Sequence, residues 1–235
     1  MQLDRVAEGR FTLRHFAFEL TELRNKLLQM GGMVESSVHR SVRALVDRDQ
    51  HLAQMVLDGE PAINQMEKDV DELCTRLLVL QQPMARDLRF LTSVLKINTD
   101  LERMGDLAKN IASRTLSLLK VPPLKLNVDI PHISSLVEQM LLKSLDAFVQ
   151  EDADLAQQVL QADDEVDALR TAAYGDIVTF MQHNPPQVQS GMELVFVVRN
   201  LERIGDHATN MAEDVIFMTK GVDVRHRSSK VETVS

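Results

Sequence analysis

A motif of thirteen residues occurs twice in this chain and constrains its fold more than any other feature. Residues 100–112 and 200–212 are identical at eight of thirteen positions, at a constant offset of 100. Both copies contain Leu-Glu-Arg-x-Gly-Asp-x-Ala-x-Asn. A match this long and this regular indicates a duplicated structural unit, so the two halves of the chain should share one fold.

A second pair of segments shows how far the duplication extends. Residues 48–57 match residues 151–160 at six of ten positions, at an offset of 103. The offset changes near Pro83 in the first half and near Pro185 and Pro186 in the second, where we expect a turn. We therefore predict two homologous units, residues 10–121 and 130–220. An ordered linker with several prolines joins them, and residues 221–235 form a polar, flexible tail.

Apolar residues recur at helical spacing in both units. The second motif carries a seam with alternating steps of three and four, formed by Leu194, Val197, Leu201, Ile204, Ala208, Met211 and Val215. Aromatic residues make up only 4%, and 9 glycines and 7 prolines are too few for a turn-rich β protein. The sequence therefore predicts an all-α fold of two tandem, pseudo-symmetric three-helix bundles.

Two places in the predicted helices carry residues that interrupt helices. We expect long helices over residues 13–46 and 52–80, with the second broken or kinked at residues 58–61, because proline is tolerated best in a first turn. Gly31 and Gly32 indicate either a kink or a close packing site in the first helix.

Charge and composition exclude several classes of function. The net charge of −9 disfavours binding to nucleic acid or to anionic lipid, and it favours binding of cations. No apolar run approaches the roughly 18 residues that span a bilayer, and the N-terminus lacks the pattern of a signal peptide. The single Cys74 suits a reducing compartment. We expect a cytoplasmic protein.

The duplicated motif places carboxylates one helical turn apart, on a shared helix face. Carboxylate and amide oxygens without a matching set of Cys or His residues suit hard cations such as Mg²⁺, Mn²⁺ or ferric iron. The candidate ligands are Glu102, Asp106, Glu202 and Asp206, with Asn110 and Asn210 as weaker candidates. A solvated face with ion pairs is the alternative interpretation. Gly105 and Gly205, both inside helices, indicate the close approach of a neighbouring backbone.

Two further carboxylate pairs are weaker candidates, and each is also consistent with an acidic surface. They are Glu67 with Asp71 and Asp163 with Asp167. In the register without gaps, Glu67 corresponds to Arg170, whereas Asp163 corresponds to Glu60. Each pair could supply a ligand to its own bundle.

Three motifs together resemble the PhoU family. They are the doubled Leu-Glu-Arg-[Met/Ile]-Gly-Asp, Met-Gly-Gly-Met-Val-Glu at residues 30–35, and Gln-Pro-x-x-x-Asp-Leu-Arg at residues 82–89. The resemblance implies tandem three-helix bundles, no catalytic activity, and metal sites at Glu102/Asp106 and Glu202/Asp206. It also implies a negative regulator of the phosphate-starvation regulon that links the phosphate ABC transporter to a membrane sensor histidine kinase, often as a homodimer.

The two copies differ in ways that bear on these expectations. Ser113 and Arg114 of the first copy correspond to Glu213 and Asp214 of the second. We therefore expect the second site to hold extra carboxylates, the first to rely on Glu67 and Asp71, and the two affinities to differ. A carboxylate-bridged di-iron enzyme is disfavoured, because no Glu-x-x-His occurs in the sequence. A metal-binding or metal-buffering protein without a signalling role is the remaining alternative.

Overall fold

The described chain is entirely helical apart from its connections. The computed structural model describes residues 2–126 and 128–225, with side chains described from residue 15 onward. The elements are α1 (Gln2–Val46), α2 (Gln50–Gln81), α3 (Ala85–Leu118), α4 (Ile130–Gln150), α5 (Ala153–His183), the short 3₁₀ helix η1 (Pro185–Gln187) and α6 (Val188–Lys220). Residues 221–225 lie outside the helices, and the rest of the predicted tail, 226–235, lies outside the described residues.

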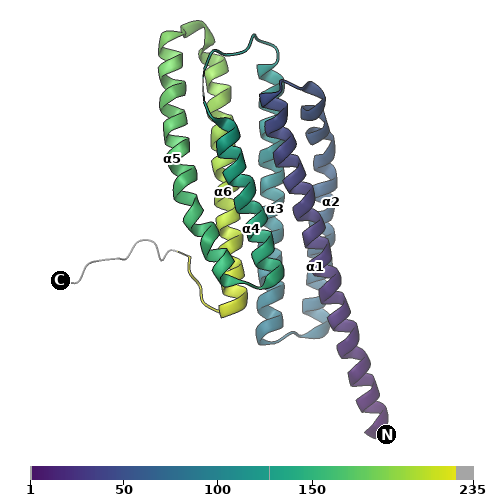
Figure 1. Cartoon of the computed structure of the whole chain (residues 1–235). Coiled ribbons are helices and arrows are strands. Elements are labelled where there is room, and N and C mark those ends of the chain that lie inside the picture. Colours follow the sequence, from purple (N-terminus) through teal and green to yellow (C-terminus); the bar gives the residue numbers. More distant parts are fainter. Residues whose placement is uncertain (1, 127, 226–235) are drawn as a thin grey trace, which may run out of the picture.

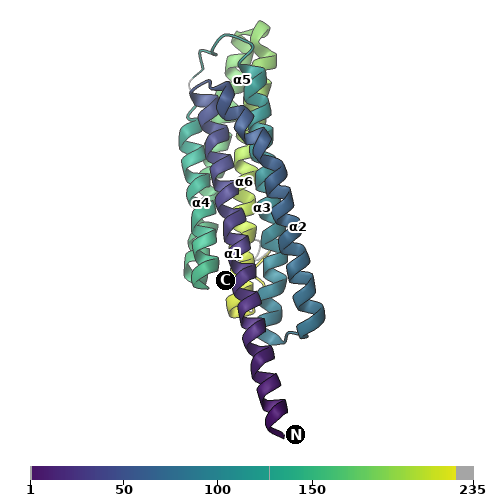
Figure 2. The same cartoon turned by 90° about the vertical axis from the view of Figure 1, so that its right-hand side faces the viewer.

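The six helices form two antiparallel three-helix units that lie side by side, as predicted (Figures 1 and 2). The first unit contains α1 to α3 and the second contains α4 to α6. Helices α3 and α6 pack against each other at the centre, α1 contacts α4, and α2 and α5 lie on the outside. Within the described residues, none of the helices is both long and apolar enough to cross a membrane.

Matching residues start the second helix of each unit. Asp49 precedes α2, and its carboxylate accepts hydrogen bonds from the backbone N–H groups of His51 and Leu52. Asp152 precedes α5 and accepts from the two equivalent N–H groups. These N-caps satisfy donors that have no partner inside the helix, and they fix both helix starts at the same place in the repeat.

The residue before each N-cap lies in the turn between two helices, and the two residues bind different parts of the molecule. Arg48 and Glu151 occupy matching positions and have φ angles of 52° and 51°. The Arg48 guanidinium donates to the Leu118, Leu119 and Val121 carbonyl oxygens at the end of α3. Glu151 instead accepts from Arg24 of α1, at 2.8 Å, and from Arg86 of α3. Glu151 thereby ties the second unit to the first.

Of the two alternatives predicted for residues 58–61, a break or a kink, the break is wrong, because α2 continues as one helix through Pro61. Val56 and Ile63, on either side of this stretch, are both buried against the rest of the unit. Packing of that apolar face keeps the helix intact even though Pro61 removes one backbone donor. Local sequence preference is a weak guide where tertiary contacts act on both sides of the residue.

Gly31 is a close packing site between α1 and α4, the second of the two alternatives considered for this position. A Cβ at Gly31 would lie 2.8 Å from both terminal methyl groups of Leu145. Gly32, by contrast, has nothing within 4 Å of such an atom. Helix α1 runs through both glycines without interruption, so Gly31 lets Leu145 approach the helix backbone directly.

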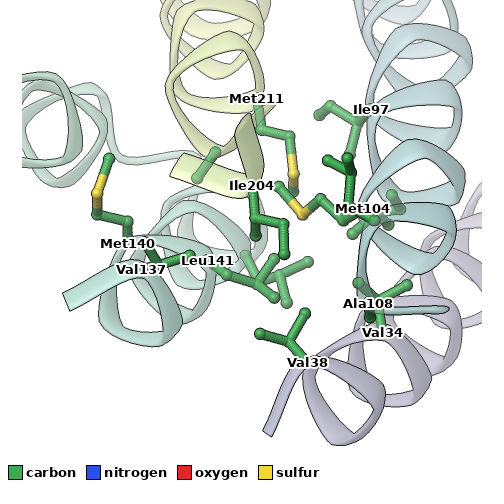
Figure 3. Packing of buried hydrophobic residues seen from close by; sticks show 14 of the residues in the cluster. Val34, Val38, Ile97, Met104, Ala108, Val137, Met140, Leu141, Ile204 and Met211 are labelled. Atoms are coloured by element: carbon green, nitrogen blue, oxygen red, sulfur yellow. The ribbon is translucent and has the colours of Figure 1, made fainter. Parts of the chain in front are cut away.

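A continuous apolar core joins the two units. Figure 3 shows side chains from α1, α3, α4 and α6 meeting in one cluster. Those labelled there are all buried: Val34, Val38, Ile97, Met104, Ala108, Val137, Met140, Leu141, Ile204 and Met211. Because the seams of α3 and α6 bury against the opposite unit as well as their own, neither unit has a complete core by itself.

Polar pairs also cross from α3 to α6. They are Lys96 Nζ with Asp214 Oδ1 at 2.8 Å, Asp100 Oδ1 with His207 Nδ1 at 2.7 Å, and Arg114 Nη1 with Glu193 Oε2 at 3.1 Å. The Arg114 guanidinium also lies over the Phe196 ring, 4.6 Å from its centroid. These contacts fix the register of α3 relative to α6.

Candidate functional site

Four carboxylates gather where α2 faces α3, and we call them the first acidic cluster. They are Glu60 and Glu67 of α2 with Glu102 and Asp106 of α3. The pKa of Glu102 is raised, mainly by burial and then by the charge of Asp106, with smaller contributions from Glu67 and Glu60. The structure therefore brings the first copy of the motif together with α2, on the outer side of the first unit.

The second acidic cluster occupies the matching place where α5 faces α6. It contains Asp163 and Asp167 of α5 with Glu202 and Asp206 of α6. Burial, followed by the charge of Asp206, raises the pKa of Asp163 to about 6. The pKa values of Glu202 and Asp206 are also raised, first by burial and then by neighbouring carboxylates. Negative charge is therefore incompletely balanced in this cluster.

Each cluster contains one basic side chain that reaches across the two helices. In the first, Lys109 Nζ of α3 lies 2.9 Å from Glu60 Oε1 and lowers the pKa of Glu60. In the second, Arg170 of α5 lies between two carboxylates, with Nη2 3.2 Å from Asp167 Oδ1 and Nε 3.6 Å from Glu202 Oε1. The two basic residues come from positions that do not correspond in the repeat.

Three of the weaker candidates, Glu67, Asp163 and Asp167, belong to these clusters, and the other three lie apart from them. Asn110 is exposed, and Asn210 points to α3, where its amide donates to Asp100 Oδ1 at 3.4 Å. Asp71 accepts a hydrogen bond from Asn98 at 2.9 Å. Residues four apart on an α-helix differ in direction by about 40°, so a row that starts on one face leaves it within two or three turns.

The expected extra carboxylates of the second site lie elsewhere, and that prediction is wrong. Asp214 is almost fully buried and binds Lys96 of α3. Glu213 lines the same surface groove as Lys96 and Asp100, between α3 and α6. The rotation from Glu202 to Asp214 is about 120° over three turns, which carries Asp214 from the α5 side of the helix to the α3 side.

Three members of the clusters were not singled out from the sequence: Glu60, Lys109 and Arg170. Lys109 corresponds to Thr209 in the second half, so the repeat gave no signal for it. Glu60 corresponds to Asp163 in the register without gaps, and Arg170 corresponds to Glu67, so the alignment of the two halves contained the signal for both. The expected close backbone approach at the motif glycines is wrong. A Cβ at Gly105 would lie 3.2 Å from two Ile63 side-chain atoms, and one at Gly205 would meet only side chains, at 3.8 Å.

The chemistry of the clusters fits a hard cation, although their side chains do not converge on one point. Among the described residues, no three His, Cys, Asp or Glu side chains are placed to hold a metal ion together. Carboxylates repel one another, and Lys109 and Arg170 draw individual members aside. The described part of the chain has two buried side-chain polar atoms without a hydrogen-bond partner, Asn98 Oδ1 and Arg170 Nε. Arg170 belongs to the second cluster, and Asn98 donates to the Glu67 carbonyl oxygen beside the first.

Comparisons with known proteins match both units of the chain to one family. The PhoU domain model matches residues 27–115 and 130–215, once in each unit. The chain is 44% identical over 214 residues to the phosphate-specific transport system accessory protein PhoU homolog of Pseudomonas aeruginosa, covering 91% of this chain and 88% of that protein. It is 37% identical over 225 residues to the Caulobacter vibrioides homolog, covering 95% and 98%.

Two crystal structures share the fold. PhoU from Pseudomonas aeruginosa superposes with a TM-score of 0.85 at 43% identity, covering 88% of this chain and all of that one. The phosphate transport system regulatory protein PhoU from Streptococcus pneumoniae gives a TM-score of 0.83 at 30% identity, covering 89% and 99%. Both units of the chain are therefore matched in sequence and in structure.

Proposed function

The chain belongs to the PhoU family, and from this premise we propose that it is an accessory regulator of phosphate transport. The observation that carries the proposal is the match over both units to proteins named for that role. In the finer form of the proposal, the protein is a cytoplasmic adaptor. It contacts the phosphate ABC transporter and a membrane sensor histidine kinase, and it keeps the phosphate-starvation regulon off when phosphate is abundant.

An exposed apolar end of the first unit supports a docking role. Val79, Leu80 and Met84, where α2 turns into α3, are 69%, 67% and 81% exposed. Large apolar side chains grouped at one end of a rigid bundle commonly mark a surface for a protein partner. We therefore propose that this end of the α2–α3 hairpin contacts one of the two partners.

The regulatory proposal is tested by deleting the gene and following a phosphate-starvation reporter at high phosphate. Loss of the protein should switch the reporter on, and the wild-type gene should restore repression. Leu80→Asp/Met84→Asp should fail to restore it, whereas Val178→Asp, at a residue 44% exposed on α5, serves as the matched control and should restore it. A reporter that stays off after deletion would rule out the regulatory role and favour the metal-buffering alternative.

We also propose that the two acidic clusters bind hard divalent or ferric cations. Oxygen-only donors, raised pKa values and the partly unsatisfied Asn98 support the proposal. A cation bound by these carboxylates would neutralise their charge, and it would tie α2 to α3 or α5 to α6. Metal analysis of the purified protein tests the proposal: Glu102→Ala/Asp106→Ala and Glu202→Ala/Asp206→Ala should each lose metal. Undiminished metal in both variants would refute it.

A homodimer completes the proposal. One chain has a mass of 26.5 kDa. Light scattering of the purified full-length protein should give twice that mass. A monomer at micromolar concentration would remove dimerisation from the proposal without affecting the regulatory role.

A further inference from the structure

A mainly apolar cavity lies beside the segment that joins the two units. This segment runs past the ends of α5 and α6, at the opposite end of the molecule from the α2–α3 turn (Figure 1). The cavity has a volume of about 650 Å³, and its walls come from α1, α3, the joining segment, α4, α5 and α6. Sites for small molecules usually enclose roughly 300–1,000 Å³ and are lined mostly by apolar side chains. No member of either acidic cluster lines this cavity.

The space exists because α4 is shorter than its counterpart α1. Helix α4 begins at Ile130, which corresponds to Leu27 of α1 at the offset of 103, and the buried residues of the two helices match in this register. In the first unit, α1 extends further toward the N-terminus and covers α2. There Leu23 is fully buried, and Glu19 Oε1 lies 3.1 Å from Arg76 Nη2 of α2. The second unit has no helical turns at the corresponding place.

Helix α5, which faces this place, also carries smaller or more polar side chains than α2. At the offset of 103, Val70 and Leu73 of α2 correspond to Ala173 and Asp176 of α5. Val70 and Leu73 are buried, whereas Asp176 is exposed. The second unit therefore lacks both the covering helix and part of the apolar surface beneath it.

The joining segment fills the space only in part. Leu124, Leu126 and Val128 line the cavity, whereas Lys125 between them is exposed. This alternation directs the apolar side chains of the segment toward the cavity. All three remain only half-buried, so an apolar molecule in the cavity would remove more of their surface from water.

Arg48 gives the cavity a cationic group. Its counterpart in the repeat, Glu151, lines a smaller cavity of about 300 Å³ at the other end of the molecule, where Arg24 and Arg86 bind its carboxylate. Within the described residues, Arg48 has no carboxylate partner of this kind. Its hydrogen bonds all run from Nη2 to backbone carbonyl oxygens at the end of α3. Nε and Nη1 are therefore available to a ligand.

Two carboxylates also line the cavity, and both are more exposed than Arg48. Asp129 is the N-cap of α4, and its side chain accepts a hydrogen bond from the His132 N–H group. Asp176 lies on the exposed face of α5. Arg48 is half-buried. Water screens the exposed carboxylates more than the guanidinium, so the attraction of an anion to Arg48 exceeds its repulsion by Asp129 and Asp176.

We propose that this cavity binds a small amphipathic anion. The apolar body of the ligand packs between the joining segment and α5, and its anionic group accepts hydrogen bonds from Arg48. Burial of apolar surface supplies most of the affinity, and the charge-assisted hydrogen bonds to the guanidinium select for the anion.

Anilinonaphthalene sulfonate is a suitable probe, because it combines apolar rings with one anionic group and fluoresces in apolar surroundings. Fluorescence and calorimetry on the purified full-length protein should show one saturable site per chain. Leu80→Asp/Met84→Asp removes the exposed apolar end of the first unit as a second place for the dye, and it should leave the saturable site unchanged.

Ala173→Val/Asp176→Leu refills the cavity with the residues that the first unit uses at the same positions. It should weaken dye binding by roughly tenfold or more, because the ligand loses its space. The variant also removes a carboxylate, which by charge alone would strengthen binding of an anion, so weaker binding has a steric cause. Glu165→Leu, on the exposed surface of α5 away from the cavity, is the matched control and should bind the dye normally.

Arg48→Gln tests the anionic part of the proposal. It should weaken binding of the sulfonate dye by roughly tenfold or more, and it should leave binding of the uncharged analogue phenylnaphthylamine unchanged. Gln82 adopts a φ angle of 46°, close to the 52° of Arg48, so glutamine is compatible with this turn. Thermal unfolding followed by circular dichroism checks that each variant is folded.

Each outcome decides one part of the proposal. Absence of dye binding by the wild-type protein, or its loss in Leu80→Asp/Met84→Asp, overturns the site. Unchanged binding in Ala173→Val/Asp176→Leu does the same. Equal binding of the sulfonate dye by the wild-type protein and Arg48→Gln refutes the role of Arg48. Loss of binding in the filled variant, together with a loss in Arg48→Gln that is confined to the charged dye, supports the proposal.

Discussion

The two glycines of the repeated motif should respond to alanine in opposite ways. Inside a helix, alanine is favoured over glycine by about 1 kcal/mol. A Cβ at Gly205 would meet Met140, Val137 and Val166 at 3.8 Å, which is ordinary van der Waals contact. Gly205→Ala should therefore raise the free energy of unfolding by about 1 kcal/mol and raise Tm by roughly 2–4 °C for a chain of this size.

Gly105→Ala gains the same helix propensity but meets a crowded neighbour. Its Cβ would lie 3.2 Å from both Cδ1 and Cγ2 of Ile63, which is only 2% exposed and has little room to move. Overpacking of a buried site costs about 1–3 kcal/mol, which exceeds the propensity gain at most values in that range. We expect Gly105→Ala to lower the free energy of unfolding by about 1 kcal/mol.

Urea and thermal unfolding followed by far-UV circular dichroism measure both effects, with EDTA present so that cation binding does not contribute. Ile63→Val removes Cδ1 and provides a double-mutant cycle. It should recover part of the loss in the Gly105→Ala background and show no coupling with Gly205→Ala. Equal shifts of the same sign for the two glycine variants, or no coupling between Ile63 and residue 105, would refute the steric argument.

Four further substitutions test other parts of the structure. Arg24, and then Arg86, lower the pKa of Glu151, so the stabilisation from this carboxylate is present above its ordinary pKa of 4.5 and is lost as the pH falls through its lowered value. Glu151→Gln should cost about 1 kcal/mol at pH 7, after allowance for solvent screening, and little in acid. The pKa of Asp163 is raised from 3.8 to about 6, so its charge destabilises the fold above pH 6 and not below pH 3.8. Asp163→Asn should therefore stabilise the cation-free protein on the order of 1 kcal/mol at pH 7.5, and thermal scans should show no gain near pH 4. Asp49→Ala and Asp152→Ala each remove an N-cap and should each cost about 1 kcal/mol in urea unfolding; a large difference between them would contradict their equivalence.

The helical architecture could be predicted because its signals are periodic and occur twice. The seam through Leu201 and Ile204 repeats every three or four residues, and its copy in the first half strengthens the same interpretation. Burial of these residues in the structure confirms the seam. The continuity of α2 through Pro61 was not predictable in this way, because it depends on packing with residues distant in the sequence.

The candidate site was predicted in part, for a geometric reason. Glu202 and Asp206 are one turn apart and do face the same neighbouring helix. Extending that row to Asp214 fails, because the side-chain direction rotates with each four-residue step along the helix. Asp214 therefore faces the other unit, where it pairs with Lys96. The role of Arg170 depends on which helix faces which, and this information is absent from the periodicity of any single helix.

The polar pairs between α3 and α6 have a consequence for the history of the duplicated unit. At the offset of 100 that relates the two motifs, Asp214 corresponds to Arg114. Two copies of the first unit meeting in the same antiparallel manner would therefore set Lys96 against Arg114, where the present chain sets Lys96 against a carboxylate at 2.8 Å. Like charges would repel at that contact.

The contact of Asp100 would also be unfavourable between two copies of the first unit. His207, its partner at 2.7 Å, corresponds to Leu107 in the first unit, so a pair of first units would leave an almost buried carboxylate facing an apolar side chain. An isologous interface, in which identical units meet about a twofold axis, would place unfavourable pairs at both of these contacts. At these contacts the first unit is therefore complementary to the second unit and not to another copy of itself.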